Sequence, residues 1–193
     1  MQFDVDARAV LDFWFGAPGS AEHGSRRAEW FRKDPAFDAL IRQRFGSLVS
    51  EALAGLSFGE TPDESLGRII VLDQFTRNMH RDTSLAFAGD PQARALALAI
   101  TQRGDDARLL PVQRSFVYLP FEHAEDAAMQ DLSVCCFEAL VAETPALQDL
   151  LDYALKHRDI VRRFGRFPHR NAILGRPSSA AELAFLTEPG SHF

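Results

Sequence analysis

Four prolines directly follow a residue that can cap a helix, and this pairing constrains the fold more than any other feature of the sequence. A Ser, Thr, Asp or Asn side chain just before a helix can accept a hydrogen bond from an N–H that has no partner within the helix. Proline at the first helical position loses nothing, because its missing N–H would be unpaired there. Four helices should therefore begin at Asp34-Pro35, Thr61-Pro62, Asp90-Pro91 and Thr144-Pro145.

Glycines follow these starts at helix-like distances. Gly55, Gly104 and Gly165 stand where the residue after the last helical turn favours a left-handed conformation. Start signals, stop signals and hydrophobic spacing together predict helices over 6–15, 25–32, 35–54, 62–79, 91–103, 111–119, 121–142, 145–164 and 178–187. A break within the 121–142 helix is expected near Gln130.

No segment has the alternating pattern of a β-strand. The strongest candidate, Ser115–Leu119, is short and is closed by Pro120. The 193 residues are ample for one domain and short for two, and no Pro-, Gly- or Ser-rich linker divides them. We therefore predict an all-α fold of antiparallel helix pairs, in a single domain over residues 1–193.

Composition and charge narrow the possible partners. Hydrophobic residues make up 46% of the chain and charged residues 25%, which excludes a disordered protein. No apolar run approaches the ~20 residues that span a bilayer, and the acidic beginning, with Asp4 and Asp6, is unlike a signal peptide. The net charge of −6 does not favour nucleic acid. The two cysteines, Cys135 and Cys136, are adjacent, and neighbours in sequence rarely form a disulfide, so we expect reduced thiols and a cytoplasmic location. Their helix looks buried, so we also expect both thiols to lie in the core.

Charge is unevenly distributed near the C-terminal end. Residues 115–155 contain eight acidic side chains and no Lys or Arg, whereas residues 156–176 contain seven basic side chains and one acid, Asp159. The two blocks could pair with each other in the fold. Alternatively, the basic block could be held for an anionic ligand, with the acids flanking a cavity.

The helix predicted after Pro62 places charges where an apolar surface is expected. Asp73 and Arg77 continue the apolar stripe that begins at Leu66, and the opposite side of the helix is apolar too. A helix of this kind is expected to be buried, and buried charges need partners. Asp73 and Arg77 can pair at their i, i+4 spacing, either as a structural ion pair or as part of a pocket floor. The polar side chains that remain are Gln74, Asn78, His80 and Arg81.

The basic segment that follows residue 156 is the second unusual feature. Arg158 falls within the core stripe of the 145–164 helix and His157 falls at its edge. Beyond the helix, three kinds of donor side chain surround Gly165, an arrangement suited to gripping an oxyanion. The alternative is a basic helix end, favoured by the helix dipole, followed by a solvated loop. The donors in question are Arg163, Arg166, His169, Arg170 and Asn171.

A third feature is the segment Leu119–Asp126. Pro120 is expected to begin a helix with acids in its first turn, where the dipole favours them. His123 and Asp126, spaced i, i+3, could hold a metal or form a His–carboxylate base. One histidine beside acids is a weak metal signal, so we assign no metal. The chain also lacks a Gly-rich phosphate loop and the G-x-S-x-G, H-E-x-x-H and C-x-x-C motifs, and we assign no cofactor.

Several of these segments together resemble the DUF924 family. They are Val10–Gly16, Ile70–Asn78 with Arg81, Leu119–His123, His157–Ile160 with Arg163–Asn171, and Glu182–Leu186. The resemblance covers nearly the whole chain. It implies an all-α fold of the tetratricopeptide-like kind, a right-handed superhelix of helix pairs, although no 34-residue repeat is visible. It implies no activity, because the function of the family is unknown.

The sequence favours two functions and ranks RNA binding, through the interleaved Arg and Phe residues at 162–170, below both because of the negative net charge. The first is binding of a small carboxylate or phosphate in an internal Arg/His-lined pocket, with enzymatic activity undecided. The second is recognition of an acidic peptide or protein segment in a tetratricopeptide-like groove. For the first, the titratable catalytic candidates are His123, His157 and His169. The ligand-binding candidates are Asp73, Gln74, Arg77, Asn78, Arg81, Glu122, Arg158, Arg163, Arg166, Arg170 and Asn171.

One geometric expectation links these features. The 73–81 helix and the 163–171 loop each hold donors that their own helical pattern does not require. We predict that the two converge, so that Arg77 or Arg81 approaches the loop across a cavity or a shared carboxylate.

Overall fold

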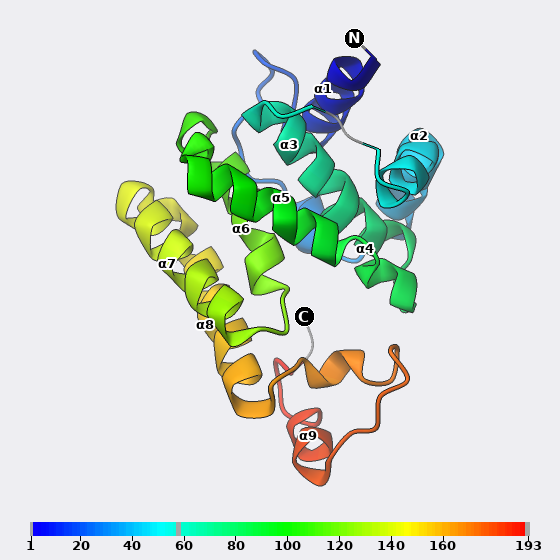
Figure 1. Cartoon of the computed structure of the whole chain (residues 1–193), viewed down its shortest axis with the longest axis vertical. Helices are drawn as coiled ribbons and strands as arrows, with labels where there is room; N and C mark the ends of the chain where they lie inside the picture. The colour runs from blue at the N-terminus through cyan, green and yellow to red at the C-terminus, as the bar shows by residue number, and fades with distance from the viewer. Residues whose placement is uncertain (1, 57–58, 192–193) are drawn as a thin grey trace.

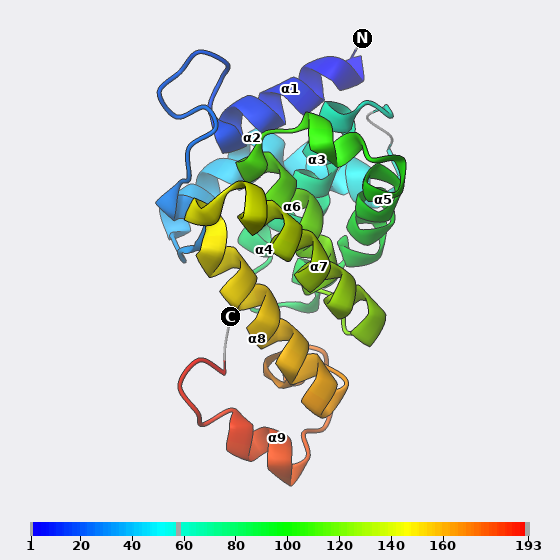
Figure 2. The same ribbon diagram turned by 90° about the vertical axis from the view of Figure 1, so that its left-hand side faces the viewer.

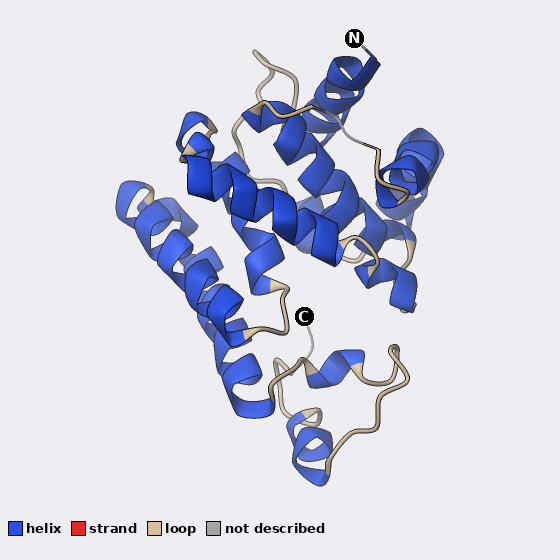
Figure 3. Cartoon of the chain, viewed as in Figure 1, coloured by secondary structure: helices blue, strands red, loops and turns tan. Residues whose placement is uncertain are grey.

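The computed structural model describes residues 2–56 and 59–191, and side chains from residue 6 onward. All regular secondary structure in these residues is helical, and no strand occurs among them (Figure 3). The prediction of an all-α fold is confirmed. The nine α-helices of the described chain are α1 (Gln2–Phe15), α2 (Pro35–Leu53), α3 (Pro62–Ile69), α4 (Thr76–Met79), α5 (Asp90–Arg103), α6 (Pro111–Glu122), α7 (Ala127–Glu143), α8 (Gln148–Phe164) and α9 (Ala180–Phe185).

Local signals explain several of these boundaries. The Asp34 side chain accepts from the backbone N–H groups of Ala36 and Phe37, and Thr61 accepts from the N–H of Glu64. Gly104 and Gly165 end α5 and α8 with φ of 70° and 72°, in the left-handed region that favours glycine. These side chains and glycines act within one helical turn, which is why the sequence alone identifies them.

Two predicted caps do not form. Asp90 is the first residue of α5, and its carboxylate pairs with Arg77 instead of capping the helix. Thr144 precedes a short 3-10 turn, Pro145–Leu147, without a side-chain cap.

The predicted helix at 25–32 is a single 3-10 turn, Ala28–Phe31, and the 121–142 helix begins later than expected. Pro120 lies inside α6, which continues to Glu122. The break falls at residues 123–126, where the Asp126 side chain caps α7, and not at Gln130. The expectation of buried thiols is wrong as well, since Cys135 is exposed and Cys136 is half-buried.

The helices form a main body and an extension. In the main body, α3 packs against α1 and α5, and α7 lies between α6 and α8 (Figure 1). An aromatic cluster fills its core, with Phe116 at 4.8 Å from Trp30 and 5.8 Å from Trp14 between ring centroids. The last part of α8 projects beyond the body and leads to α9 (Figure 2). We call residues 160–191 the C-terminal segment; its small apolar cluster contains Ile160, Val161, Phe164, Phe167 and Phe185.

The centre of the body is a helix that changes type. The predicted 62–79 helix is α-helical at both ends but forms a π-helical turn over Ile70–Phe75. This wider turn contains Asp73 and Gln74, both buried. Gly89 packs directly against it, and a Cβ at that position would overlap the Leu72 carbonyl oxygen. The close approach requires glycine and brings the start of α5, with Asp90, beside the π-turn.

Two finer predictions are not tested by this architecture. The tetratricopeptide-like superhelix and the single domain over residues 1–193 both stay predictions. Among the described residues, no helix has the length and hydrophobicity required to cross a membrane.

Candidate functional site

A cavity of about 720 Å³ opens between the π-turn, the end of α6, the first half of α8 and the segment 26–32. Its walls combine arginine, histidine and acidic side chains with aromatic and aliphatic ones. The lining residues are Arg26, Arg27, Ala28, Trp30, Phe31, Arg32, Gln74, Arg77, Asn78, Arg81, Leu119, Glu122, His123, Asp149, Leu150, Tyr153 and His157. Seven predicted site residues meet here, although they come from three distant parts of the chain.

Asp73 lies behind the cavity wall and organises it. Its carboxylate is 2.8 Å from Nδ1 of His123 and 2.9 Å from a terminal nitrogen of Arg77, and it accepts a 2.6 Å hydrogen bond from Gln74. Burial by itself would raise the pKa of Asp73, but the charge of Arg77 and the contacts with His123 and Gln74 hold it well below its usual range. The carboxylate is therefore ionised and acts only as an acceptor.

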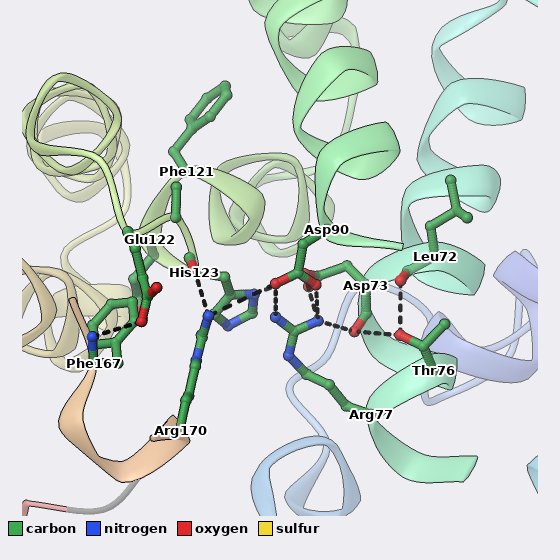
Figure 4. Close-up of polar contacts among 12 residues, drawn as sticks. Leu72, Asp73, Thr76, Arg77, Asp90, Phe121, Glu122, His123, Phe167 and Arg170 are labelled. Carbon is green, nitrogen blue, oxygen red and sulfur yellow. Dashed lines mark hydrogen bonds and ion pairs between the residues drawn. The ribbon is translucent and has the colours of Figure 1, made fainter. Parts of the chain in front are cut away.

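The π-turn supports this arrangement through its backbone. A π-turn changes the partners of the helical carbonyls, and such turns are frequent at functional sites. The Thr76 hydroxyl donates to the carbonyl of Leu72 at 2.7 Å, and Arg77 donates to the carbonyl of Asp73 at 2.6 Å (Figure 4). The side chain of Arg77 thus bonds both the carboxylate and the backbone of Asp73.

Asp90 connects the helix that carries Arg77 with the C-terminal segment. Its oxygens lie 3.0 Å from Arg77 and 3.8 Å from Arg170, and Figure 4 shows both guanidinium groups approaching it. Arg170 also donates to the backbone carbonyl of His123 at 3.0 Å and stacks on Phe167. The predicted convergence of the 73–81 helix and the 163–171 loop across a shared carboxylate is thus present in the structure.

Burial of Arg170 has an electrostatic consequence. Desolvation, together with the nearby positive charge of Arg77, lowers the pKa of Arg170 to about 10. The guanidinium is still charged near neutral pH. It therefore adds positive charge beside His123 without lining the cavity.

Glu122 and His157 form the second polar pair in the wall. Nδ1 of His157 lies 3.1 Å from Oε1 of Glu122 and 2.9 Å from the carbonyl oxygen of Tyr153. Burial, reinforced by the charge of Asp73, raises the pKa of Glu122 to about 8. Burial also lowers the pKa of His157 to about 3. Near neutral pH, both groups are therefore uncharged, Glu122 as a carboxylic acid and His157 as an imidazole.

A third set of contacts joins the part of the wall formed by Asn78 and Arg81 to α2. Arg81 donates from Nε at 2.6 Å and from one terminal nitrogen at 3.0 Å to the carboxylate of Asp38, which also accepts from Asn78 at 2.7 Å. This fork anchors Arg81 to α2 while its guanidinium lines the cavity.

Segment 26–32 forms a wall that the sequence analysis missed. Arg26 pairs with Asp149 at 2.6 Å, Arg27 donates to the carbonyl of Phe13 at 2.6 Å, and Trp30 donates to the carbonyl of Trp14 at 3.0 Å. Three arginines around an aromatic pair in an acidic chain are as unusual as the basic residues at 162–170. The local density of basic residues, which indicated the 162–170 segment, therefore also indicates this one.

The remaining predicted site residues lie outside the cavity. Arg158 is half-buried on α8 but is not among the lining residues. Arg163 stacks on Phe164 and Phe185, and His169 lies against Phe167. Within the C-terminal segment, Arg166 pairs with Glu182, and Asn171 contacts Ser178, Glu182 and Arg176.

The acidic block at 115–155 both pairs with the basic block at 156–176 and contributes side chains to the cavity wall. Arg162 pairs with Asp131 at 2.7 Å, and Arg176 pairs with Glu125 at 2.5 Å, so acids of one block bind bases of the other. Glu122 and Asp149, from the same acidic block, line the cavity instead.

A second, smaller cavity of about 440 Å³ lies against α1 and the start of α3, and it contains none of the predicted site residues. No cluster of three or more potential metal ligands occurs among the described residues. The larger cavity is therefore the better candidate for a functional site.

The arrangement can be compared with known proteins. The family described as bacterial protein of unknown function (DUF924) matches residues 10–190. The chain belongs to the DUF924 family. No curated protein matches it. A solved structure of a protein of unknown function from Agrobacterium tumefaciens is 38% identical, with 94% of this chain and 96% of that chain covered and a TM-score of 0.76.

Membership in DUF924 confirms the resemblance found in the sequence, and both the N-terminal and the C-terminal motifs lie within the matched range. It assigns no activity. The chemistry of the cavity is therefore the best basis for a functional proposal.

Proposed function

We propose that this DUF924 protein binds a small organic anion, a carboxylate or a phosphate ester, in the 720 Å³ cavity. The observation that carries the proposal is the charge of the lining. Five arginines face two acidic side chains, Glu122 and Asp149. Because Glu122 is protonated near neutral pH, the lining arginines outnumber the lining carboxylates, although Arg26, Arg77 and Arg81 are each also paired with a carboxylate.

Arg81 illustrates how a ligand would be held. A guanidinium has five N–H donors, and the Asp38 carboxylate engages Nε and one terminal nitrogen. Among the described residues, the other terminal nitrogen has no hydrogen-bond partner. A carboxylate or phosphate in the cavity would complete this donor set without breaking the anchor to α2.

The other walls suit an organic molecule. Leu119 and Leu150 are apolar, Trp30 is buried, and Phe31 and Tyr153 are exposed at the edge. Cavities of ~300–1,000 Å³ with apolar walls and a few polar groups are typical of small-molecule sites. We therefore prefer a small anion to the acidic peptide that the sequence left open. We also propose a cytoplasmic location, consistent with two free cysteines.

Thermal-shift and calorimetric measurements test the proposal with defined probes. The panel consists of inorganic phosphate, oxalate, citrate, malate and glycerol phosphate. A bound anion at a hundredfold excess over its Kd stabilises the native state by ~2.7 kcal/mol. Arg81→Lys keeps the charge but removes the fork, and should weaken binding about tenfold.

Arg162→Lys is the matched control, because Arg162 is an exposed arginine whose partner, Asp131, also lies outside the cavity. It should leave the Kd within about twofold. Equal weakening by the two variants, or no stabilisation by any anion of the panel, would contradict the proposed function.

A further inference from the structure

We propose that His123 and Glu122 form an acid–base pair in the cavity, with His123 accepting a proton from the bound ligand and Glu122 donating one to it. The inference rests on the proposed function, because it needs a ligand in the cavity. It goes further by assigning a class of reaction, the movement of a proton between two atoms of a small anion.

The contacts of Asp73 determine the tautomer of His123. The Asp73 carboxylate already accepts from Gln74 and Arg77 and is ionised, so it cannot donate. The 2.8 Å contact with Nδ1 of His123 therefore requires the hydrogen on Nδ1. In a neutral imidazole, Nε2 then carries the lone pair. Nε2 lies on the edge of the ring that is not bound to Asp73, and His123 is one of the residues that line the cavity.

The groups around His123 keep the ring neutral and in place. The backbone N–H of His123 donates to the carbonyl of Leu119 at 2.9 Å, and the backbone carbonyl of His123 accepts from Arg170. Burial and the charge of Arg77 lower the pKa of His123, while Asp73 and Asp90 oppose this. A neutral imidazole at physiological pH is a proton acceptor and not a donor. The charged and titratable groups that face it from neighbouring elements are Asp73, Arg77, Asp90, His157 and Arg170, and Glu122 precedes it in the chain.

Glu122 has the complementary state. Among the described residues it forms no ion pair with Lys or Arg, and its carboxyl contacts Nδ1 of His157 at 3.1 Å. That N–H is shared with the carbonyl of Tyr153, so it only weakly favours a carboxylate. Burial therefore leaves the carboxyl protonated, in agreement with its raised pKa of about 8. Two neighbouring carboxyl groups, Asp73 and Glu122, thus have pKa values pushed far apart, a pattern that separates acid and base roles.

The proposed step conserves protons and electrons. A C–H or O–H bond of the ligand breaks, its proton forms an N–H bond with Nε2 of His123, and the electron pair stays on the ligand. The carboxylic proton of Glu122 moves to the ligand atom that gains negative charge, which leaves Glu122 as a carboxylate. The ligand departs as a tautomer. Solvent then removes the proton from His123 and returns one to Glu122. Proton transfer of this kind contributes about 10²–10⁴-fold to a rate.

Nitrogen and carbon NMR of the ligand-free protein measures the tautomer of His123 and the protonation state of Glu122 directly. At pH 7, we expect His123 to be protonated at Nδ1 and unprotonated at Nε2, and we expect Glu122 to titrate near pH 8. Asp73→Asn should remove the preference for this tautomer, whereas Glu122→Gln should leave it unchanged. The wild-type spectrum decides even where Asp73→Asn does not fold. A hydrogen on Nε2 at pH 7, or a Glu122 carboxyl that titrates below pH 6, would overturn the proposal.

Diethyl pyrocarbonate distinguishes an accessible base from a structural histidine, because it modifies unprotonated imidazole nitrogen. We expect rapid modification of His123 in the wild type and in Glu122→Gln, and a rate lower by on the order of tenfold in Asp73→Asn. An unreactive His123 in the folded wild type would overturn the proposal. Protection by an anion of the panel supports both proposals. Rapid modification that no anion slows would contradict anion binding while leaving the state of His123 established.

Discussion

The main body surrounds its polar groups with an extensive apolar core, whereas the C-terminal segment is attached mainly through charged side chains. In the body, the network of Asp73 and Arg77 lies beside fully buried residues such as Leu72 and Phe75. The C-terminal segment has a small apolar cluster of its own, around Phe167 and Phe185. Its ties to the body include the pairs of Arg176 with Glu125 and of Arg170 with Asp90, and the Phe167 N–H bound to Glu125.

The difference indicates how each region should respond to change. Apolar burial acts over the whole core and makes its unfolding cooperative. A segment with few buried contacts can open locally, at a free energy lower than that of global unfolding. The cavity lies in the body, but Arg170 of the segment contacts His123 in its wall. Local opening of the segment would therefore remove a contact of the candidate site.

The largest expected effect comes from the buried network of the body. Asp73→Ala leaves Arg77 and His123 without their shared carboxylate, and should destabilise by about 3–5 kcal/mol. Urea unfolding followed by circular dichroism measures the loss. Asp131→Ala, which removes the exposed partner of Arg162, is the control and should cost less than about 1 kcal/mol. A loss below ~1 kcal/mol for Asp73→Ala would show that the pair is effectively solvated.

The next test compares the two apolar clusters with the same substitution. Phe137→Ala empties a fully buried position of the body and should destabilise by about 3–5 kcal/mol. Phe185→Ala acts on the small cluster, where the loss is limited by the local stability of the segment, and should lower global stability by less than about 1 kcal/mol. Hydrogen exchange should instead become faster over residues 180–187. Equal losses of global stability would show that the segment unfolds together with the body.

The third prediction concerns pH and Glu122. Its folded pKa of about 8 lies above the unfolded value of ~4.3, so between these values the native state binds more protons than the unfolded state. Stability contributed by this group is therefore present below pH ~4 and is lost as the pH rises towards 8. The Tm of the wild type should fall by at least about 3 °C relative to Glu122→Gln between pH 5 and pH 8. A constant Tm difference across this range would contradict the raised pKa.

The smallest expected effect is at Glu125, which ties the segment to the body. Burial would raise its pKa, but hydrogen bonds from Arg176 and the Phe167 N–H lower it overall. Its contribution is therefore present above the unfolded pKa of ~4.3 and is lost as the pH falls through the folded value. Glu125→Gln should lower the free energy of local opening of the segment by about 1 kcal/mol, leave global stability unchanged, and speed hydrogen exchange only over residues 165–191. Faster exchange across α1 and α3 as well would argue against a locally stabilised segment.

Helical structure was predictable because its signals are local. Asp34, Thr61 and Gly165 act on N–H and carbonyl groups within one turn, and the structure shows each at a helix end. The pairing of Asp73 with Arg77 follows from helical spacing as well. The helix start predicted at Pro120 is wrong, because a proline that begins a helix and a proline near the end of one carry the same local signal.

The sequence by itself determined the helical class, most helix boundaries, the family and the residues in which polar groups interrupt an apolar pattern. Only the tertiary structure decided which of those residues meet. The π-turn packs closely against Gly89, and the next residue, Asp90, lies 3.0 Å from Arg77, a contact that brings together two helices, α4 and α5. The cavity joins residues 26–32, 74–81, 119–123 and 149–157, which no sequence spacing relates. Helix signals act through bonds between near neighbours, whereas a cavity depends on how distant surfaces exclude water together, and this is settled only when the chain packs.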